Sequence, residues 1–340
     1  MKLATWLVAA SAFVVTAVLT EAVRRLLLHR GMLDIPNSRS SHQEPTPRGG
    51  GIAIVAATQM GMLALFVMGQ IPLSLLLAVS GGLAIAAIGF ADDLRHVHHL
   101  LRLAVHCSAA IWALACLHGV APLNVGGRVA DLGALGLVLA FFGIVWTLNL
   151  FNFMDGLDGL AGSEAVFVLA VGGSLAGGAA GAGPAAVVVA AAAAGFLLWN
   201  WPPARIFLGD VGSCYLGYLV AVLAFDAGRG LPAAPWIWLI LGSIFFADAT
   251  VTLMRRMLRG EHVYKAHRTH AFQWQVRRWG SHRAVTSAVT MINIAVLLPL
   301  AVLARNQPAY SMLIALTTLA ALSVFALIVG SGRHEGPSSN

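Results

Sequence analysis

The sequence predicts an all-α, polytopic integral membrane protein with about eleven transmembrane helices. Of its 340 residues, 59% are hydrophobic and only 10% are charged, and the mean hydropathy is +0.81. Apolar runs recur along the whole chain at lengths near the ~20 residues that a helix needs to cross a bilayer. This combination is typical of a membrane protein and argues against a soluble globular core.

The predicted helices follow one another in chain order. The first run follows Lys2, and we interpret it as a retained helix because no small-residue cleavage site precedes Glu21. The sixth and seventh runs are rich in Ala and Gly, which suits close packing between helices. The eleven runs lie near 3–20, 50–68, 71–90, 100–117, 132–150, 160–178, 184–199, 211–225, 235–254, 284–304 and 309–329.

Basic residues set the predicted orientation. With residue 1 outside, the inside segments hold 17 of the 21 Lys and Arg residues, which leaves outside only Lys2, Arg128, Arg229 and Arg305. Because cytoplasmic loops are enriched in Lys and Arg, we expect the N-terminus outside and the C-terminus inside. The formal net charge of +7 then needs no nucleic acid to explain it. No repeat or linker divides the chain, so residues 1–340 are expected to form one membrane domain with a basic cytoplasmic loop at 255–283.

Acidic residues gather on the same predicted side as the basic loops. The outside loops carry only Asp131 and Asp226, whereas Asp248 lies within a run near the inside. Ionisable groups at a membrane boundary are costly unless they are paired or functional, so we expect a polar site on the cytoplasmic face. The acids in or beside the inside segments include Asp92, Asp93, Asp155, Asp158, Glu164 and Asp210.

A turn rich in proline and glycine, residues 45–51, precedes the second run. Its prolines prevent helix formation, and its three glycines let the backbone approach a ligand or another helix closely. Arg48 in this turn is a candidate contact for a phosphate or a nucleotide. The alternative is a plain turn before a helix, with one arginine that reaches the membrane surface.

Asp92 and Asp93 end the third run. Adjacent carboxylates repel each other, and on a helix their side chains diverge by about 100°. We therefore expect them to have different roles rather than to chelate one ion together. The alternative is a solvated helix end.

Asn152, Asp155 and Asp158 recur at a spacing of three residues. If this stretch is helical, they line one face, and Gly156 and Gly159 leave room there for a bulky ligand. Amide and carboxylate oxygens suit Mg²⁺ or hydrogen bonds to ribose and base. A purely structural polar cap is the alternative.

Asp210 begins the eighth run in a turn flanked by Gly209 and Gly212. Free backbone N–H groups at a helix N-terminus favour phosphate, and the carboxylate suits an accompanying Mg²⁺. Simple N-capping by Asp210 is the alternative. The chain has no G-x-x-x-x-G-K-[ST] loop, which argues against an ATPase.

The loop at 255–283 contains eight Lys and Arg residues. Two histidines around an arginine, at His267, Arg268 and His270, would suit a pyrophosphate, and the loop would also suit an anionic membrane surface. A plain basic anchor is the alternative. Asp248 is expected to pair with a basic residue one or two turns below it, Arg255 or Arg256.

These segments together resemble a known family. Their order between about ten or eleven spans is similar to that of the polyprenyl-phosphate N-acetylhexosamine-1-phosphate transferases, bacterial glycosyltransferase family 4, over roughly residues 40–330. The resemblance rests on Asp92-Asp93 and on the stretches 152–159, 207–213 and 267–270. It implies transfer of a sugar 1-phosphate from a UDP-sugar to undecaprenyl phosphate with Mg²⁺, or Mn²⁺ as its substitute, and release of UMP.

The resemblance also implies a role for each matching residue. Asp210 would be the principal Mg²⁺ ligand with Asp155, and Asn152 and Asp158 would line the nucleotide and metal site. Asp92 or Asp93 would deprotonate or orient the lipid phosphate. The substrate contacts would further include Asn200, Phe207, Gly209, Arg48, Arg268 and His270, with His267 as a catalytic group.

Departures from one branch of the family narrow the assignment. The peptidoglycan enzyme has three consecutive histidines where Arg268 and Thr269 stand here, and a lysine near the proline-rich turn for which His42 is the nearest equivalent. The resemblance therefore favours the enzymes that initiate O-antigen or other cell-surface polysaccharides, in the bacterial inner membrane with the active site facing the cytoplasm. Membrane lipids and a second copy of the chain are further candidate partners.

Alternatives from other classes stay open. A phospho-N-acetylmuramoyl-pentapeptide transferase is the alternative within the family. A cation-coupled transporter would also carry acids within the membrane, but near its midplane rather than at one face. Within the transferase reading, direct displacement and a phospho-aspartyl intermediate on Asp92 or Asp93 are two routes, of which we favour direct displacement because the lipid phosphate is already an oxyanion.

The predicted orientation can be tested by cysteine labelling. In a chain whose native cysteines Cys107, Cys116 and Cys214 are replaced, a membrane-impermeant thiol reagent added outside should label a cysteine placed at Gly230 and not one placed at Gly260. The reverse labelling pattern would place all the candidate site residues on the side opposite to UDP-sugars.

Overall fold

The computed structural model describes residues 1–36, 44–176, 178, 181–261 and 267–333, and it confirms the all-α class. In the first half of the chain the helices are α1 (Leu3–His29), α2 (Gly51–Val67), α3 (Leu73–Ser80), α4 (Gly82–Leu94), α5 (His99–Cys116), α6 (Gly133–Met154) and α7 (Leu160–Ala176). The second half contains α8 (Ala182–Asn200), α9 (Asp210–Ala227), α10 (Ala234–Leu241), α11 (Ser243–Leu258), α12 (Ala271–Trp279), α13 (His282–Ile292), α14 (Leu298–Asn306) and α15 (Ser311–Val329).

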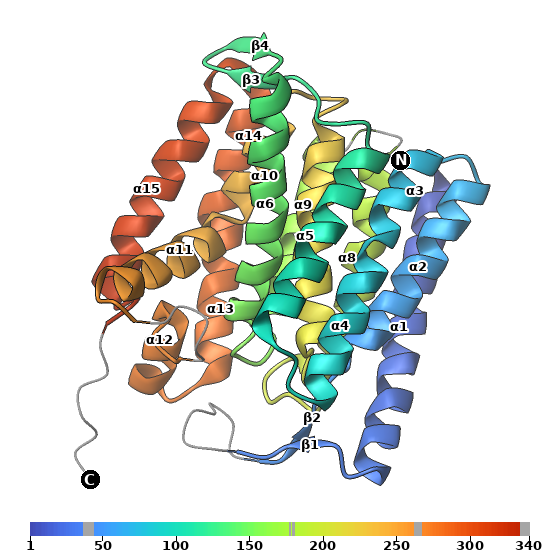
Figure 1. Ribbon diagram of the computed structural model, residues 1–340, viewed down its shortest axis with the longest axis vertical. Helices are drawn as coiled ribbons and strands as arrows, with labels where there is room; N and C mark the ends of the chain where they lie inside the picture. The colour runs from blue at the N-terminus through green and yellow to red at the C-terminus, as the bar shows by residue number, and fades with distance from the viewer. Residues whose placement is uncertain (37–43, 177, 179–180, 262–266, 334–340) are drawn as a thin grey trace.

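Two short antiparallel hairpins mark opposite ends of the helical bundle (Figure 1). Strands β1 (Leu33–Asp34) and β2 (Thr46–Pro47) pair at the lower end in that view. Strands β3 (Leu123–Val125) and β4 (Arg128–Ala130) pair at the upper end. The helices run between these two ends, which are called here the β1 end and the β3 end.

When the helices are judged by length and hydropathy, fewer than the predicted eleven are suited to cross a membrane. Every predicted apolar run falls on a helix or on consecutive helices. Within the described residues, eight spans are long and apolar enough to cross a membrane, and a ninth is the pair α10 and α11. Helices α2 and α7, with 17 residues each, are shorter apolar helices. Eleven crossings therefore stays a prediction.

The predicted continuous run at 235–254 is broken. Helix α10 ends at Leu241 and α11 begins at Ser243, with a bend of 70° between them. Gly242 stands at the break, and glycine is the poorest helix former apart from proline. A π-helical segment, η1 (Asn293–Leu297), likewise interrupts the next long span between α13 and α14.

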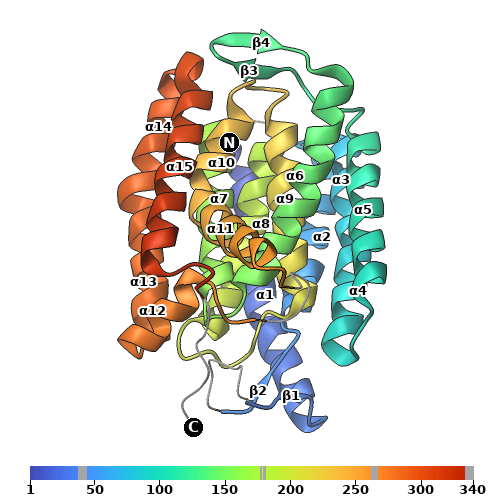
Figure 2. The ribbon, with the colours of Figure 1, turned by 60° about the vertical axis from the view of Figure 1, so that its left-hand side comes forward.

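Helix α9 lies at the centre of the bundle, with α3 to α5 on one side and α13 to α15 on the other (Figure 2). It packs against α2, α4, α6, α7, α8 and α10. Almost every residue of α9 is buried, including Tyr215 and Tyr218. Its first residue, Asp210, is therefore held at the β1 end by the most enclosed helix in the bundle.

Glycines allow the close approach of neighbouring helices to the start of α9. A Cβ added at Gly51 would collide with the backbone of Gly212, and one added at Gly89 would lie 2.6 Å from the Asp210 carbonyl oxygen. Both contacts are with backbone, which cannot move aside as a flexible side chain can. The backbones of α2 and α4 thus pack directly on the first turn of α9.

A Gly51→Ala substitution should destabilise the protein by about 1–3 kcal/mol, because the added methyl overpacks a backbone contact. Thermal unfolding of the purified protein in detergent measures this. Gly230→Ala is the matched control, because a Cβ there meets only the Ala227 carbonyl oxygen, at 3.8 Å. Equal melting temperatures for the two variants would contradict the proposed packing constraint.

Candidate active site

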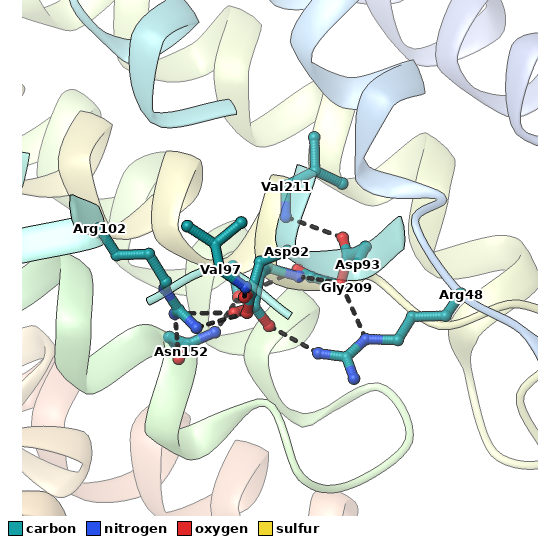
Figure 3. A network of polar contacts seen from close by, with 10 residues as sticks. Arg48, Asp92, Asp93, Val97, Arg102, Asn152, Gly209 and Val211 are labelled. Carbon is teal, nitrogen blue, oxygen red and sulfur yellow. Dashed lines mark hydrogen bonds and ion pairs between the residues drawn. The ribbon is translucent and has the colours of Figure 1, made fainter. Parts of the chain in front are cut away.

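Side chains from four parts of the chain meet at the β1 end around the start of α9 (Figure 3). Asp92 and Asp93 come from the last turn of α4, Asp210 is the first residue of α9, Arg102 lies on α5, and Arg48 precedes α2. We call these five residues the carboxylate cluster. The structure thus brings together three predicted acids and one predicted arginine, and it adds Arg102.

Asp210 lies between two arginines. Its Oδ1 is 2.6 Å from Arg48 Nη2, and its Oδ2 is 2.7 Å from Arg102 Nη2. The Asp210 side chain is only 7% exposed, so its charge requires compensation by partners rather than by water. Arg48 is 42% exposed and Arg102 21%, so Arg48 forms the side of the cluster that is more open to solvent.

Asp93 caps the same helix end. It accepts hydrogen bonds from the backbone N–H groups of Asp210 (3.0 Å) and Val211 (3.1 Å), and its Oδ1 is 2.9 Å from Arg48 Nε. These N–H groups have no partner within the helix, so a carboxylate is favoured there. Gly209 enters the helix at φ +76°, and a Cβ on it would collide with Asp93. The capping contact therefore requires glycine at this position.

Asp92 has different partners from its neighbour. It accepts a hydrogen bond from the Val97 backbone N–H (2.7 Å) and pairs with Arg102. The divergence of the two side chains agrees with the angle expected for adjacent helical residues. Their separate roles in a reaction stay a prediction.

Asn152 joins the cluster from the last turn of α6. Its amide donates to Ser213 Oγ (3.1 Å) and accepts from Arg102 Nη2 (3.4 Å). Asp155 follows the end of α6, and burial raises its pKa well above the usual value, with Arg48 opposing that rise. The nearby negative charges of Asp210 and Asp93 raise its pKa further. Asp155 thus belongs electrostatically to the same site.

The expected helical face of Asn152, Asp155 and Asp158 is wrong. Helix α6 ends at Met154, and Gly159 adopts φ +72°, so a turn follows instead of a further helical turn. Asp158 accepts a hydrogen bond from the Ala204 backbone N–H (3.0 Å) and lies 3.3 Å from His282 Nδ1. Its described contacts hold the turn to the loop after α8 and to α13.

Asn200 and Phe207 support the site through backbone contacts. The buried Asn200 amide accepts from the Gly159 N–H (3.1 Å) and donates to the Ile206 carbonyl oxygen (3.0 Å). Phe207 forms a β-bridge with Arg48, and its carbonyl oxygen accepts from the N–H of Gly50 (2.9 Å). These bonds fix the turn that carries Arg48. Their proposed contacts with uridine stay predictions.

The histidine segment at 267–270 lies around Asp248. His270 is 2% exposed, with Nδ1 3.6 Å from Asp248 Oδ1, and its ring centroid is 4.9 Å from that of His267. Burial, with the neighbouring His270, lowers the pKa of His267 to about 3, so that imidazole is neutral at neutral pH. The Arg268 carbonyl oxygen accepts from the Arg277 guanidinium (3.1 Å). The described contacts of this segment are with Asp248, with α12 and with Gly332, whose N–H donates to the Thr269 carbonyl oxygen, rather than with the carboxylate cluster.

The expected pairing of Asp248 with Arg255 or Arg256 is wrong. Asp248 accepts hydrogen bonds from the Ala271 backbone N–H (2.9 Å) and Ser331 Oγ (2.7 Å), so it caps the start of α12. Arg255 donates to the Ser331 carbonyl oxygen (2.8 Å), and Arg256 lies 3.5 Å from Glu261. His42 and residues 262–266 of the basic loop lie outside the described residues.

Arg102 is a site residue that the sequence motifs did not predict. It lies in the first turn of an apolar helix, at the edge of a predicted inside loop. An arginine within an apolar helix requires an anionic partner nearby, and that signal was available in the sequence. Its partners are Asp92 and Asp210.

The donors around Asp210 fit a magnesium ion. Among the residues that the structure describes, no group of three or more His, Cys, Asp or Glu side chains is placed to hold a metal by itself. Mg²⁺, however, is usually bound by one or two carboxylates together with water and substrate phosphates. Asp210 and Asp155 supply carboxylates, and Arg48 and Arg102 are well suited to phosphate. The set therefore fits a cation whose coordination is completed by a bound phosphate.

Comparison with known proteins gives consistent similarities. The family model of glycosyl transferase family 4 matches residues 73–228. The chain is 27% identical to a probable undecaprenyl-phosphate N-acetylglucosaminyl 1-phosphate transferase of Bacillus subtilis, over 81% of this chain and 78% of that protein. It is 29% identical to an undecaprenyl-phosphate alpha-N-acetylglucosaminyl 1-phosphate transferase of Thermotoga maritima, over 77% and 80%. It is 31% identical to a phospho-N-acetylmuramoyl-pentapeptide-transferase of Caldanaerobacter subterraneus, over 74% and 83%.

An Asp93→Asn substitution should destabilise the protein by about 1–3 kcal/mol, because it removes a charged cap and the ion pair with the partly exposed Arg48. Thermal unfolding in detergent measures the effect. Asp131→Asn is the control, because Asp131 is exposed and accepts one local hydrogen bond from Gly133. A melting temperature for Asp93→Asn equal to that of the control would show that the cap does not contribute.

Proposed function

Because the chain belongs to glycosyl transferase family 4, we propose that it transfers N-acetylhexosamine 1-phosphate from a UDP-sugar to undecaprenyl phosphate. The products are undecaprenyl-diphosphate-N-acetylhexosamine and UMP. The observation that carries the proposal is the buried carboxylate of Asp210 between two arginines at the start of the central helix. This step would initiate O-antigen or another cell-surface polysaccharide.

In this proposal the arginines bind the phosphates. Guanidinium groups form paired, charge-assisted hydrogen bonds with phosphate oxygens. Arg48, the more exposed of the two, would meet a diphosphate arriving from the aqueous side, and Arg102 would hold it from the helix side. Asn152, which is hydrogen-bonded to Ser213, would orient the nucleotide next to them.

Asp210 and Asp155 would hold Mg²⁺ in this site, with Mn²⁺ as a substitute. The ion supplies neutralisation of the diphosphate charge and stabilisation of the UMP leaving group. The reaction is then an in-line attack by an oxygen of the lipid phosphate on the sugar-linked phosphorus. The bond from that phosphorus to the bridging oxygen breaks, and UMP carries the electron pair away.

The contacts of Asp92 and Asp93 support direct displacement. Both oxygens of Asp93 accept backbone hydrogen bonds, and one also pairs with Arg48. Both oxygens of Asp92 are engaged as well, one by the Val97 N–H and one by Arg102. A carboxylate must give up such contacts to become a nucleophile, whereas the lipid phosphate arrives as an oxyanion. We therefore assign different positioning roles to the two residues, with Asp93 holding Arg48 and Asp92 holding Arg102.

Membrane orientation follows from the same proposal. The carboxylate cluster lies at the β1 end, together with α12 and the described parts of the basic loop (Figure 1). We infer that this end faces the cytoplasm of a bacterium, where UDP-sugars are made, and that the N-terminus lies on the other side of the inner membrane. The whole chain would act as one membrane-embedded transferase domain.

A second candidate is a phospho-N-acetylmuramoyl-pentapeptide transferase. The relative from Caldanaerobacter subterraneus with that name has the highest identity of the three relatives described above. The interruption of the histidine run by Arg268 and Thr269 favours the polysaccharide enzymes instead. Transfer assays with UDP-N-acetylglucosamine, UDP-N-acetylgalactosamine and UDP-N-acetylmuramoyl-pentapeptide as donors would decide between them.

An Asp210→Asn substitution should reduce transfer by at least about 10²-fold, because it removes the charge that holds the cation and balances both arginines. Radiolabelled product formation on undecaprenyl phosphate measures the rate. Asp131→Asn serves as the control, since Asp131 lies at the β3 end. Wild-type turnover in Asp210→Asn would overturn the assignment of this site.

Direct displacement predicts no UMP burst without the lipid acceptor. Incubation of the enzyme with UDP-sugar and Mg²⁺ alone should release no stoichiometric UMP, because the attacking oxygen belongs to the lipid phosphate. Rapid-quench chromatography measures UMP. A burst equal to the enzyme concentration, with phosphorus bound to Asp92 or Asp93, would establish the covalent route instead.

A further inference from the structure

An open groove of about 710 Å³ lies between α1 and α8, close to the β1 end. Its walls include Val18 and Arg25 of α1, Leu198 and Trp199 of α8, and Arg205 from the loop after α8. No residue of the carboxylate cluster is among those that line it. The groove is therefore separate from the proposed active site.

Two guanidinium groups lie over the ring of Trp199. The Cζ atoms of Arg24 and Arg205 are 5.7 Å and 5.8 Å from its ring centroid. The indole Nε1–H donates to the Ala17 carbonyl oxygen (2.9 Å), which fixes the ring. Cation–π contacts of this kind hold arginine side chains in place near a surface.

The groove carries an excess of positive charge. Glu21 is the carboxylate among its lining residues, and it is shared by Arg24 (2.7 Å) and Arg25 (2.6 Å). Within the part of the chain that the structure describes, Arg205 has no carboxylate within ion-pair distance, and its side chain is exposed. The two lining arginines, Arg25 and Arg205, outnumber the lining carboxylate of Glu21, so the groove has a net positive charge that favours an anion beside Arg205 and Arg25.

Apolar side chains continue the groove away from the arginines. Val18 is 64% exposed and Leu198 is 61% exposed, on two helices that are long and apolar enough to cross a membrane. Tryptophan is enriched at the level where lipid head groups meet acyl chains, and Trp199 lines the same groove as Val18, Leu198 and Arg205. An occupant that matches both walls has an anionic head and a hydrocarbon chain.

We propose that this groove binds an anionic phospholipid of the surrounding bilayer, with its phosphate at Arg205 and Arg25 and an acyl chain along Val18 and Leu198. Basic side chains near a membrane surface each contribute about 1 kcal/mol to binding of anionic lipid. Removal of one arginine should therefore weaken binding about fivefold.

Native mass spectrometry of the full-length protein in detergent tests the proposal, with phosphatidylglycerol and phosphatidylcholine of the same acyl chains as probes. Wild-type protein should bind phosphatidylglycerol more tightly than phosphatidylcholine. Arg205→Gln should weaken phosphatidylglycerol binding about fivefold and leave phosphatidylcholine binding unchanged. Arg278→Gln is the matched control, because Arg278 is exposed on α12, away from the groove. Its affinities should equal those of the wild type.

The melting temperature in phosphatidylcholine checks that each variant is folded. Arg25→Gln is a second variant, since the Arg25 side chain is 70% exposed, and it should weaken phosphatidylglycerol binding in the same direction. Wild-type affinity in both groove variants would overturn the proposal. An equal loss in Arg278→Gln would show a general charge effect and would also overturn it. Displacement of phosphatidylglycerol by inorganic phosphate at similar concentrations would show a phosphate site without a role for the acyl chain.

Discussion

The buried charge of Asp210 is the constraint on which the rest of the site depends. A carboxylate that is 7% exposed at the first residue of the most enclosed helix is costly unless it is paired. Its partners come from the turn before α2 and from α5, while Asp93 of α4 binds the adjacent N–H groups. The turn before α2 and the helices α4, α5 and α9 therefore meet at Asp210.

Small residues make this convergence sterically feasible. Gly51, Gly89 and Gly209 each stand where a Cβ would collide with backbone or with Asp93. The glycines around the start of α9 therefore serve packing, and the expectation for the glycines at 49–51 was close approach either to a ligand or to another helix. In the structure, the backbone of Gly51 approaches another helix, that of α9.

Charge balance explains why such a cluster suits a metal-dependent reaction on phosphates. Three carboxylates and two guanidiniums leave a net negative charge, to which Asp155 adds when it is ionised. A divalent cation would reverse that sign while Asp155 is protonated and would cancel the charge when Asp155 is ionised, so that an anionic diphosphate could replace the carboxylates as the partner of Arg48 and Arg102. Transporter sites near the middle of a membrane would need their acids in mid-helix, whereas these lie at helix ends.

The sequence was sufficient for features that are local and insufficient for pairings between distant residues. Apolar runs predicted every long helix because backbone polar groups in lipid must be satisfied within a helix. The glycine turn before Asp210 likewise marked the start of α9. The spacing of Asn152, Asp155 and Asp158 misled because it assumed that α6 continues beyond Met154. Arg102 pairs with Asp92 and Asp210, which lie on two other helices, and Asp248 binds the N–H of Ala271 on α12. The spacing of residues along one helix cannot predict such contacts between helices.

Two histidines of the basic loop, His267 and His270, differ in how they are enclosed. His270 is enclosed, with its backbone N–H bonded to Gln273 and its ring beside Asp248, so it anchors the start of α12. That helix packs against the turn after α6, where a Cβ on Gly156 would lie 3.2 Å from Phe272 and 3.3 Å from Gln273. His267 is less enclosed than His270, and burial lowers its pKa to about 3, so its imidazole is neutral at neutral pH and is not a cationic partner for a diphosphate.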